Sequence, residues 1–220
     1  MLEEKIVSLK KELLEFANHT EHMLDKAMQG LLKRDRSLLD EVLGADETRA
    51  NESELHIDEL CVSLIAQYAP KGRDLRAILM ILRMNNDLER MADHAVNIAQ
   101  SAVRLIEQPP VKPLIDIPHL AEVAGKMLHD SITSFVDENA LLAKSVCDRD
   151  DVVDNLKMQL MRELITYMTS DATTISRSLD LIRIANNLER VGDLSTNICE
   201  DVIFMAEGRV IKHHADESAA

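Results

Sequence analysis

The feature that most constrains this chain is an internal repeat, in which two 18-residue segments match without gaps at a spacing of 100 residues. Residues 83–100 read RMNNDLERMADHAVNIAQ and residues 183–200 read RIANNLERVGDLSTNICE, with identity at 8 positions. Such self-similarity predicts two homologous halves of similar structure. Three prolines within residues 109–113 mark the junction, because proline cannot continue a helix and favours an extended linker.

Composition and apolar spacing both favour helices. The chain has 3 Phe, 2 Tyr and no Trp, with only 6 Gly and 5 Pro, so it lacks the residues that strands prefer. Apolar residues recur every three or four positions, as at Ile6, Leu9, Leu13 and Phe16. We therefore predict an all-α chain of two tandem homologous three-helix bundles with up-and-down packing.

The expected helices span residues 2–42, 47–68, 75–108, 118–146, 150–169 and 174–207, with ends uncertain by about 2–4 residues. Breaks are expected near Gly44–Asp46 and Asp148–Asp151. The corresponding domains are a first bundle over 1–108, a proline-rich linker over 109–117, a second bundle over 118–210 and a disordered tail over 211–220, which contains His213 and His214.

Charge and cysteine usage exclude several classes of function. Lys and Arg number 25 against 39 Asp and Glu, a net charge of −14, which argues against binding to nucleic acid or anionic lipid. No uncharged stretch approaches the ~20 apolar residues of a membrane-spanning helix, so we expect no direct membrane insertion. The three cysteines are separate in sequence, with no C-x-x-C pair, which suits a reducing compartment. We expect a cytoplasmic protein.

An acidic and amide-rich stripe runs along the third helix of each half. At about 100° per residue, its members in the first half lie within about 80° of one another, well away from the apolar face. They are Asn86, Glu89, Asp93, Asn97 and Gln100 in the first half, and Asn186, Glu189, Asp193, Asn197 and Glu200 in the second.

Acidic residues at i and i+4 repel each other, whereas a solvated helix face gains from opposite charges at that spacing. Because carboxylate oxygens are ligands for hard and borderline cations, the repeated stripe predicts a metal site in each half. Asp154, and either Asn51 or Glu54, could add oxygens from a neighbouring helix. The alternative is a solvated face that holds nothing.

The stretches LERMADHAVNIA (88–99) and LERVGDLSTNICE (188–200) resemble the signature of the PhoU family of phosphate-uptake regulators, which occurs once in each of two halves. The resemblance implies two three-helix bundles, a cytoplasmic protein that often forms homodimers, and multinuclear iron or zinc clusters. Carried over by position, it implies metal ligands at Glu89, Asp93, Glu189 and Asp193, with lesser candidates at Asn97, Asn197, Glu200 and Asp154.

The resemblance also implies partners: the ATPase subunit of an ABC phosphate transporter and a membrane sensor histidine kinase, which the protein would link to repress the phosphate response. The halves differ where His94 aligns with Leu194 and Gln100 with Glu200. The second site carries more negative charge, so we expect it to be the better filled.

Other functions lack their motifs. A ferritin-like di-iron oxidase requires Glu-x-x-His, which the sequence does not contain. The sequence also has no glycine-rich phosphate loop, G-x-S-x-G or H-E-x-x-H, so we do not expect an enzyme. A metal-free helical adaptor of other signalling function, or a metal-storage bundle, remains the alternative.

Overall fold

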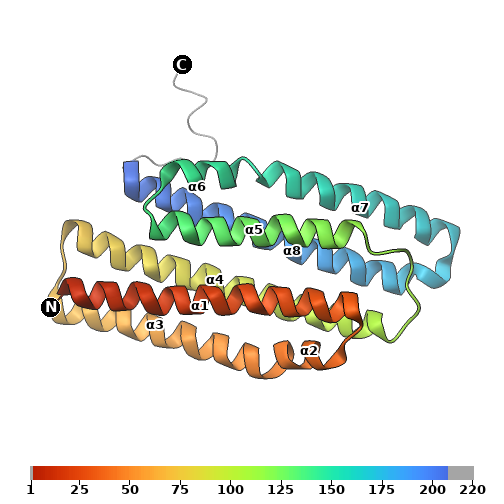
Figure 1. Cartoon of the computed structure of the whole chain (residues 1–220), viewed down its shortest axis with the longest axis horizontal. Helices are drawn as coiled ribbons and strands as arrows, with labels where there is room; N and C mark the ends of the chain where they lie inside the picture. The colour runs from red at the N-terminus through yellow and green to blue at the C-terminus, as the bar shows by residue number, and fades with distance from the viewer. Residues whose placement is uncertain (1, 208–220) are drawn as a thin grey trace, which may run out of the picture.

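The computed structural model describes residues 2–207, and this part of the chain is all-α, as predicted (Figure 1). The first half contains α1 (Leu2–Lys33), α2 (Arg36–Glu41), the π-helical turn η1 (Val42–Asp46), α3 (Glu47–Tyr68) and α4 (Gly72–Ile106). The second contains α5 (Asp116–Val136), α6 (Ala140–Cys147), α7 (Asp150–Ser170), the 3-10 turn η2 (Ala172–Thr174) and α8 (Ile175–Glu207). The tail expected over residues 211–220 lies outside the described residues.

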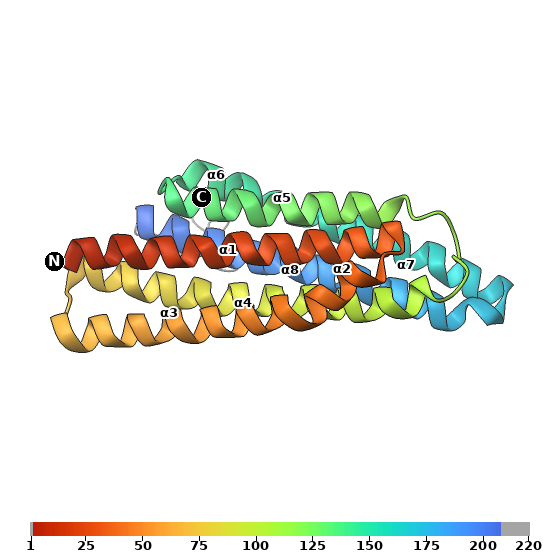
Figure 2. The ribbon, with the colours of Figure 1, turned by 60° about the horizontal axis from the view of Figure 1, so that its bottom comes forward.

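Each half is a bundle of three long rods, and the second rod of each is composite. In the first half α2, η1 and α3 follow one another as a bent rod, and in the second α6 and α7 are separated by a two-residue turn (Figure 2). The linker joins the end of α4 to the start of α5 at one end of the molecule.

Two of the expected helices are wrong. The helix expected over 2–42 ends at Lys33, because Arg34 adopts a left-handed conformation (φ 54°) and Asp35 caps α2 by accepting hydrogen bonds from the Ser37 and Leu38 amides. The helix expected over 118–146 breaks in the same way, with Glu138 at φ 50° and Asn139 capping α6. The break expected near Gly44–Asp46 is instead the π-helical turn η1, through which the rod continues.

Gly30 allows the first of these reversals. A Cβ at Gly30 would lie 2.5 Å from Leu39 Cδ2, so only glycine lets α2 fold back closely against α1. The carbonyl of Gly30 also accepts a hydrogen bond from the Asp35 amide at 2.9 Å, which closes the turn.

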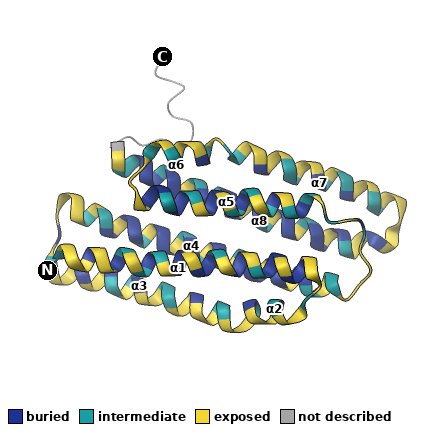
Figure 3. Cartoon of the chain, viewed as in Figure 1, coloured by how far each residue is buried: buried dark blue, intermediate teal, exposed yellow. Residues whose placement is uncertain are grey.

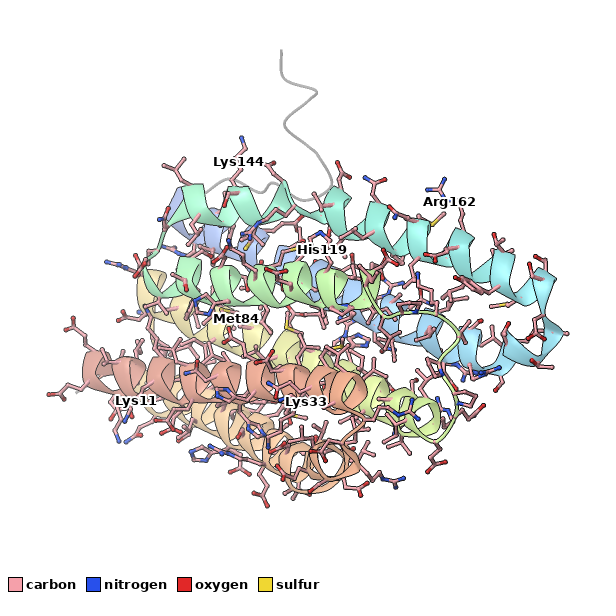
Figure 4. The ribbon with its side chains drawn as sticks, turned by 45° about the vertical axis from the view of Figure 1, so that its right-hand side comes forward. Lys11, Lys33, Met84, His119, Lys144 and Arg162 are labelled. Carbon is pink, nitrogen blue, oxygen red and sulfur yellow. The ribbon has the colours of Figure 1, made fainter. Side chains whose placement is uncertain are left out.

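The buried faces of the rods form one continuous core (Figure 3). The third rods are central: α4 packs against α1, α3 and α8, while α8 packs against α5, α6 and α7. Met84 on α4 lies between helices, whereas Lys144 on α6 and Arg162 on α7 project outward (Figure 4). Although α4 and α8 are central, one face of each helix is not covered by its neighbours. The polar residues of the helix lie on that face.

Polar bonds lock the two halves along the α4–α8 interface. The Arg104 guanidinium on α4 donates to Asp180 Oδ1 on α8 at 2.7 and 3.1 Å, and Arg83 donates to Asp201 Oδ1 at 3.1 Å. Only 4% of the Asp180 side chain is exposed. A buried, ionised carboxylate lowers the stability of the fold unless cationic side chains pair with it.

Arg104→Met should therefore lower the free energy of unfolding by about 2 kcal/mol. The loss stays below that of a fully buried pair because Arg183 Nη1 still lies 2.8 Å from Asp180 Oδ1. The matched control is Arg36→Met, which removes the exposed ion pairs of Arg36 with Asp40 and Glu107 and should change the free energy of unfolding little. Urea unfolding checks both, and equal losses would contradict the role of the interface.

Candidate functional site

The structure places the stripe of each third rod on its polar face. Asn86, Asp93, Asn97 and Gln100 are exposed on α4, and Glu89 is half-buried beside them. On α8, Asn186 and Asn197 are exposed, while Glu189, Asp193 and Glu200 are half-buried. Because Leu88, Ala92 and Ala95 on α4, and Leu188, Val191 and Ile198 on α8, fill the core, helical periodicity turns the acidic residues away from it.

In the first half, the neighbouring rod adds two carboxylates to the stripe. Glu54 on α3 lies close enough for its charge to act on Glu89, and Asp58 follows one turn later. We call Glu54, Asp58, Glu89 and Asp93 the first acidic cluster. Burial, then the charges of Asp93 and Glu54, raise the pKa of Glu89. Within residues 2–207, none of the four carboxylates has an ion-pair partner within 4.0 Å.

Asn85 fixes α3 against α4 at this cluster. Its fully buried side chain donates from Nδ2 to the Glu54 carbonyl at 2.9 Å and to Asp58 Oδ1 at 3.0 Å. Cys61 lies beyond Asp58 in the core, where burial and the Asp58 charge raise the pKa of its thiol to about 12. Cys61 therefore stays protonated at neutral pH, and the donors of this cluster are oxygens.

The second half has its own cluster, formed by Asp150 and Asp154 on α7 with Glu189 and Asp193 on α8, which we call the second acidic cluster. Of the second-rod residues, only Glu54 and Asp154 correspond at the repeat spacing. Burial, then the charges of Asp193 and Asp154, raise the pKa of Asp150. Burial and the Glu189 charge likewise raise the pKa of Asp193. In the second half, four carboxylates from two rods thus act on one another. In the first half, the charges of Glu54 and Asp93 act on Glu89, and Asp58 acts on Glu54.

The second acidic cluster differs from the first because cations of the chain already contact it. Lys157 Nζ lies 2.8 Å from Glu189 Oε1 and 3.1 Å from Asp154 Oδ1. Arg190 Nη1 lies 2.8 Å from Asp193 Oδ2. The larger negative charge expected of the second site is therefore partly neutralised, which removes the reason for expecting it to be the better filled.

Among the remaining candidates, the charges of Glu54 and Asp154 act on carboxylates of the clusters. Asn51 on α3 and Asn97 and Asn197 on the third rods are exposed, as Asp93 is. The charge of Glu200 acts on Cys147. His94 Nδ1 lies 2.8 Å from Asn187 Oδ1 across the α4–α8 interface, so it belongs to the contact between halves.

Sequence reasoning missed Asp58 and Asp150, although a signal for both was present. Glu54–Asp58 and Asp150–Asp154 have the same i, i+4 spacing as Glu89–Asp93, and they recur in the second rod of each half. A search for that spacing beyond the third rods would have found both pairs.

The donor chemistry of both clusters fits a hard or borderline cation. Carboxylate oxygens suit iron and are accepted by zinc, and a cation would relieve the repulsion that raises the pKa of Glu89 and Asp193. Within the part of the chain that the structure describes, no three His, Cys, Asp or Glu side chains are already arranged to hold a metal ion. Binding would therefore require the carboxylates of the two rods to change rotamer, and in the second cluster to displace Lys157.

The raised pKa of Glu89 predicts a pH-dependent gain in stability from Glu89→Gln. A carboxyl with a raised pKa binds its proton more tightly in the folded state, so ionised Glu89 costs stability at pH 7 and the cost disappears as the pH falls through that pKa. Without metal, the variant should be more stable at pH 7 by about 0.2–0.5 kcal/mol, with no gain near pH 4.

Thermal unfolding across this pH range checks the prediction. Glu52→Gln on the exposed side of α3 is the matched control, and it should change stability little at any pH. A loss of stability in Glu89→Gln at pH 7 would show that Glu89 is not repelled by its neighbours.

The fold and its clusters define a class of protein: a duplicated helical bundle with a group of carboxylates from two rods in each half. The model of the PhoU domain matches residues 13–102 and 117–202, and the chain belongs to the PhoU family. The resemblance drawn from the LER-containing segments is thereby confirmed.

Relatives match along nearly the whole chain. A phosphate-specific transport system accessory protein PhoU homolog of Aquifex aeolicus is 38% identical over 204 residues, which covers 93% of this chain and 92% of that protein. A second homolog, of Thermotoga maritima, is 33% identical over 217 residues, covering 99% and 92%. The crystal structure of PhoU from Pseudomonas aeruginosa superimposes with a TM-score of 0.91 at 32% identity, covering 95% of this chain and 100% of that one.

Between residues 2 and 207, no helix is both long enough and apolar enough to cross a bilayer.

Proposed function

We propose that this chain is a negative regulator of phosphate uptake and of the phosphate-starvation two-component response. In this proposal it is a cytoplasmic, metal-binding adaptor, not an enzyme, and it links the ATPase subunit of an ABC phosphate transporter to a sensor histidine kinase. The observation that carries the proposal is the match to relatives named as phosphate-specific transport system accessory proteins over 93% and 99% of this chain.

The acidic clusters support the metal-binding part of the proposal. Glu54, Asp58, Glu89 and Asp93 would hold a cation in the first half, and Asp150, Asp154, Glu189 and Asp193 in the second. A bound multinuclear iron or zinc centre would supply positive charge that neutralises each cluster. Because the carboxylates come from both the second and the third rod of each half, binding the same centre would hold these two rods together.

Exposed apolar residues on the second rods support the adaptor part. Leu55 and Val62 on α3 are 61% and 63% exposed, and Met158 and Ile165 on α7 are 46% and 50% exposed. In each pair the residues are seven positions apart, so they lie on one face of their rod. We propose that these faces serve partner binding, homodimer formation or both.

Affinity purification of the tagged chain from its own host, grown with ample phosphate, tests the proposal. The transporter ATPase and the histidine kinase should both co-purify. Recovery of other signalling proteins without these two would favour a different adaptor. Metal content that rises with metal supply, with neither partner recovered, would favour a storage bundle.

A further inference from the structure

Two of the three cysteines, far apart in sequence, meet in the second half. Cys147 is the last residue of α6, where the chain turns into α7, and Cys199 lies on α8, against which α6 packs. Thr196 Oγ1 on α8 donates to Asp150 Oδ1 on α7 at 3.5 Å. Asp150 follows Cys147 by three residues and Thr196 precedes Cys199 by three, so the packing of these segments brings the two thiols close enough for each to act on the pKa of the other. Cys199 is buried, whereas Cys147 is partly exposed. Cys61 is buried in the first half, so it provides an internal reference.

The two thiols differ in exposure, since Cys147 is partly exposed and Cys199 is buried. Ser134 Oγ lies 4.0 Å from Cys199 Sγ on its buried side. Cys147 is therefore the thiol that a small reagent from solvent can reach, and Cys199 stands directly behind it.

The surroundings favour an uncharged reagent. The charges of Glu200, Asp148 and Asp150 act on Cys147, so anionic oxidants would be repelled. Neutral hydrogen peroxide carries no such penalty. Disulfides in a reducing compartment are usually transient and regulatory, and an accessible cysteine beside a second thiol is typical of a redox-sensing site.

We propose that Cys147 and Cys199 form an oxidation site for hydroperoxides. The Cys147 sulfur attacks a peroxide oxygen, the O–O bond breaks, and the products are Cys147 sulfenic acid and water. The Cys199 sulfur then attacks the sulfenic sulfur, the S–O bond breaks, and the hydroxide takes the Cys199 proton and leaves as a second water. Two thiols are oxidised to one disulfide, one peroxide is reduced to two waters, and a cellular dithiol reverses the change.

The disulfide would link the α6–α7 turn to α8 beside the second acidic cluster. Asp150 follows Cys147 by three residues and Glu200 follows Cys199 directly. The bond would therefore restrict the movement of α7 relative to α8 at this cluster. The oxidation requires neither metal nor a phosphate-related partner, so its failure and that of the proposed function are distinguishable.

The test treats the reduced, metal-free chain with excess hydrogen peroxide, denatures it, blocks the remaining thiols with N-ethylmaleimide and measures its mass. One blocked thiol, Cys61, is expected, with a loss of about 2 Da for the disulfide. Trypsin should release residues 145–149 joined to residues 191–209. Three blocked thiols, a disulfide that includes Cys61, or one between two chains would overturn the proposal.

Variants assign the two roles. Cys61→Ala should still form the disulfide, and Cys147→Ser should leave Cys199 free to react with the maleimide. In Cys199→Ser, dimedone should trap a sulfenic acid on Cys147. A dimedone adduct on Cys61, or none on Cys147, would contradict the proposed order of attack.

Discussion

The chain with Glu89, Asp93, Glu189 and Asp193 replaced by Gln or Asn will purify without transition metal, whereas the unaltered chain will retain iron or zinc. The substitutions keep side-chain volume and remove the charge that a cation would balance at both clusters. Loss of directly bonded oxygens should weaken binding by at least the 10–100-fold typical of groups that only support a ligand. Elemental analysis after chelator-free, anaerobic purification measures the loss.

Two controls separate lost ligands from lost structure. Circular dichroism of the quadruple variant should be unchanged, because the four side chains lie outside the buried core. Glu52→Gln, on the exposed side of α3, should retain metal fully. Equal metal content in the quadruple variant and the unaltered chain would refute binding at these clusters.

The two acidic clusters should bind metal with different affinities. The carboxylates of the first have no ion-paired cation among residues 2–207, whereas Lys157 and Arg190 contact the second. Altering Glu89 and Asp93 alone should therefore remove the more tightly held metal. Lys157→Met should strengthen binding at the second cluster by about tenfold or more, since a single charge at contact distance exceeds about 1.4 kcal/mol. Unchanged affinity in Lys157→Met would contradict this competition.

Deleting the gene should switch on the phosphate-starvation genes of the host during growth with ample phosphate, to the level seen in starved cells. The reason is that loss of the proposed adaptor uncouples the histidine kinase from the transporter. Reporter expression from a phosphate-starvation promoter measures the effect. The unaltered gene should restore repression.

Complementation with the quadruple acidic variant then tests whether the clusters matter for repression. If metal holds the second and third rods in the partner-binding arrangement, the variant should fail to repress although it accumulates normally. Glu52→Gln should repress fully. Normal repression in the deletion strain itself would contradict the regulatory role. Full repression by the quadruple variant would show that the protein acts as an adaptor without metal.

The third rods, α4 and α8, could be predicted from the sequence, whereas the chain reversals after α1 and α5 could not. The repeat and the apolar spacing placed α4 and α8 within three residues of their observed ends. Arg34 and Glu138 take left-handed conformations that no residue preference indicates, although Asp35 and Asn139 are recognisable caps. Gly44 suggested a break, but a single glycine costs a helix only about 1 kcal/mol, and the packed rod continues through it.

One part of the candidate site could likewise be predicted from the sequence, and another part required the structure. Helical periodicity alone places Glu89 and Asp93 on one polar face. The side of α3 or α7 that meets this face depends on packing between rods, so Asp58, Asp150 and the ion pair of Lys157 required the structure. The proximity of Cys147 to Cys199 likewise depends on how α6 lies on α8.

The most direct test of the account is anomalous X-ray diffraction from crystals of the metal-loaded chain, recorded at the iron and zinc absorption edges. The account predicts anomalous peaks at both acidic clusters, within about 2.0–2.2 Å of the carboxylate oxygens of two rods. Peaks elsewhere, or two clusters without anomalous density in crystals that hold the metal, would contradict it.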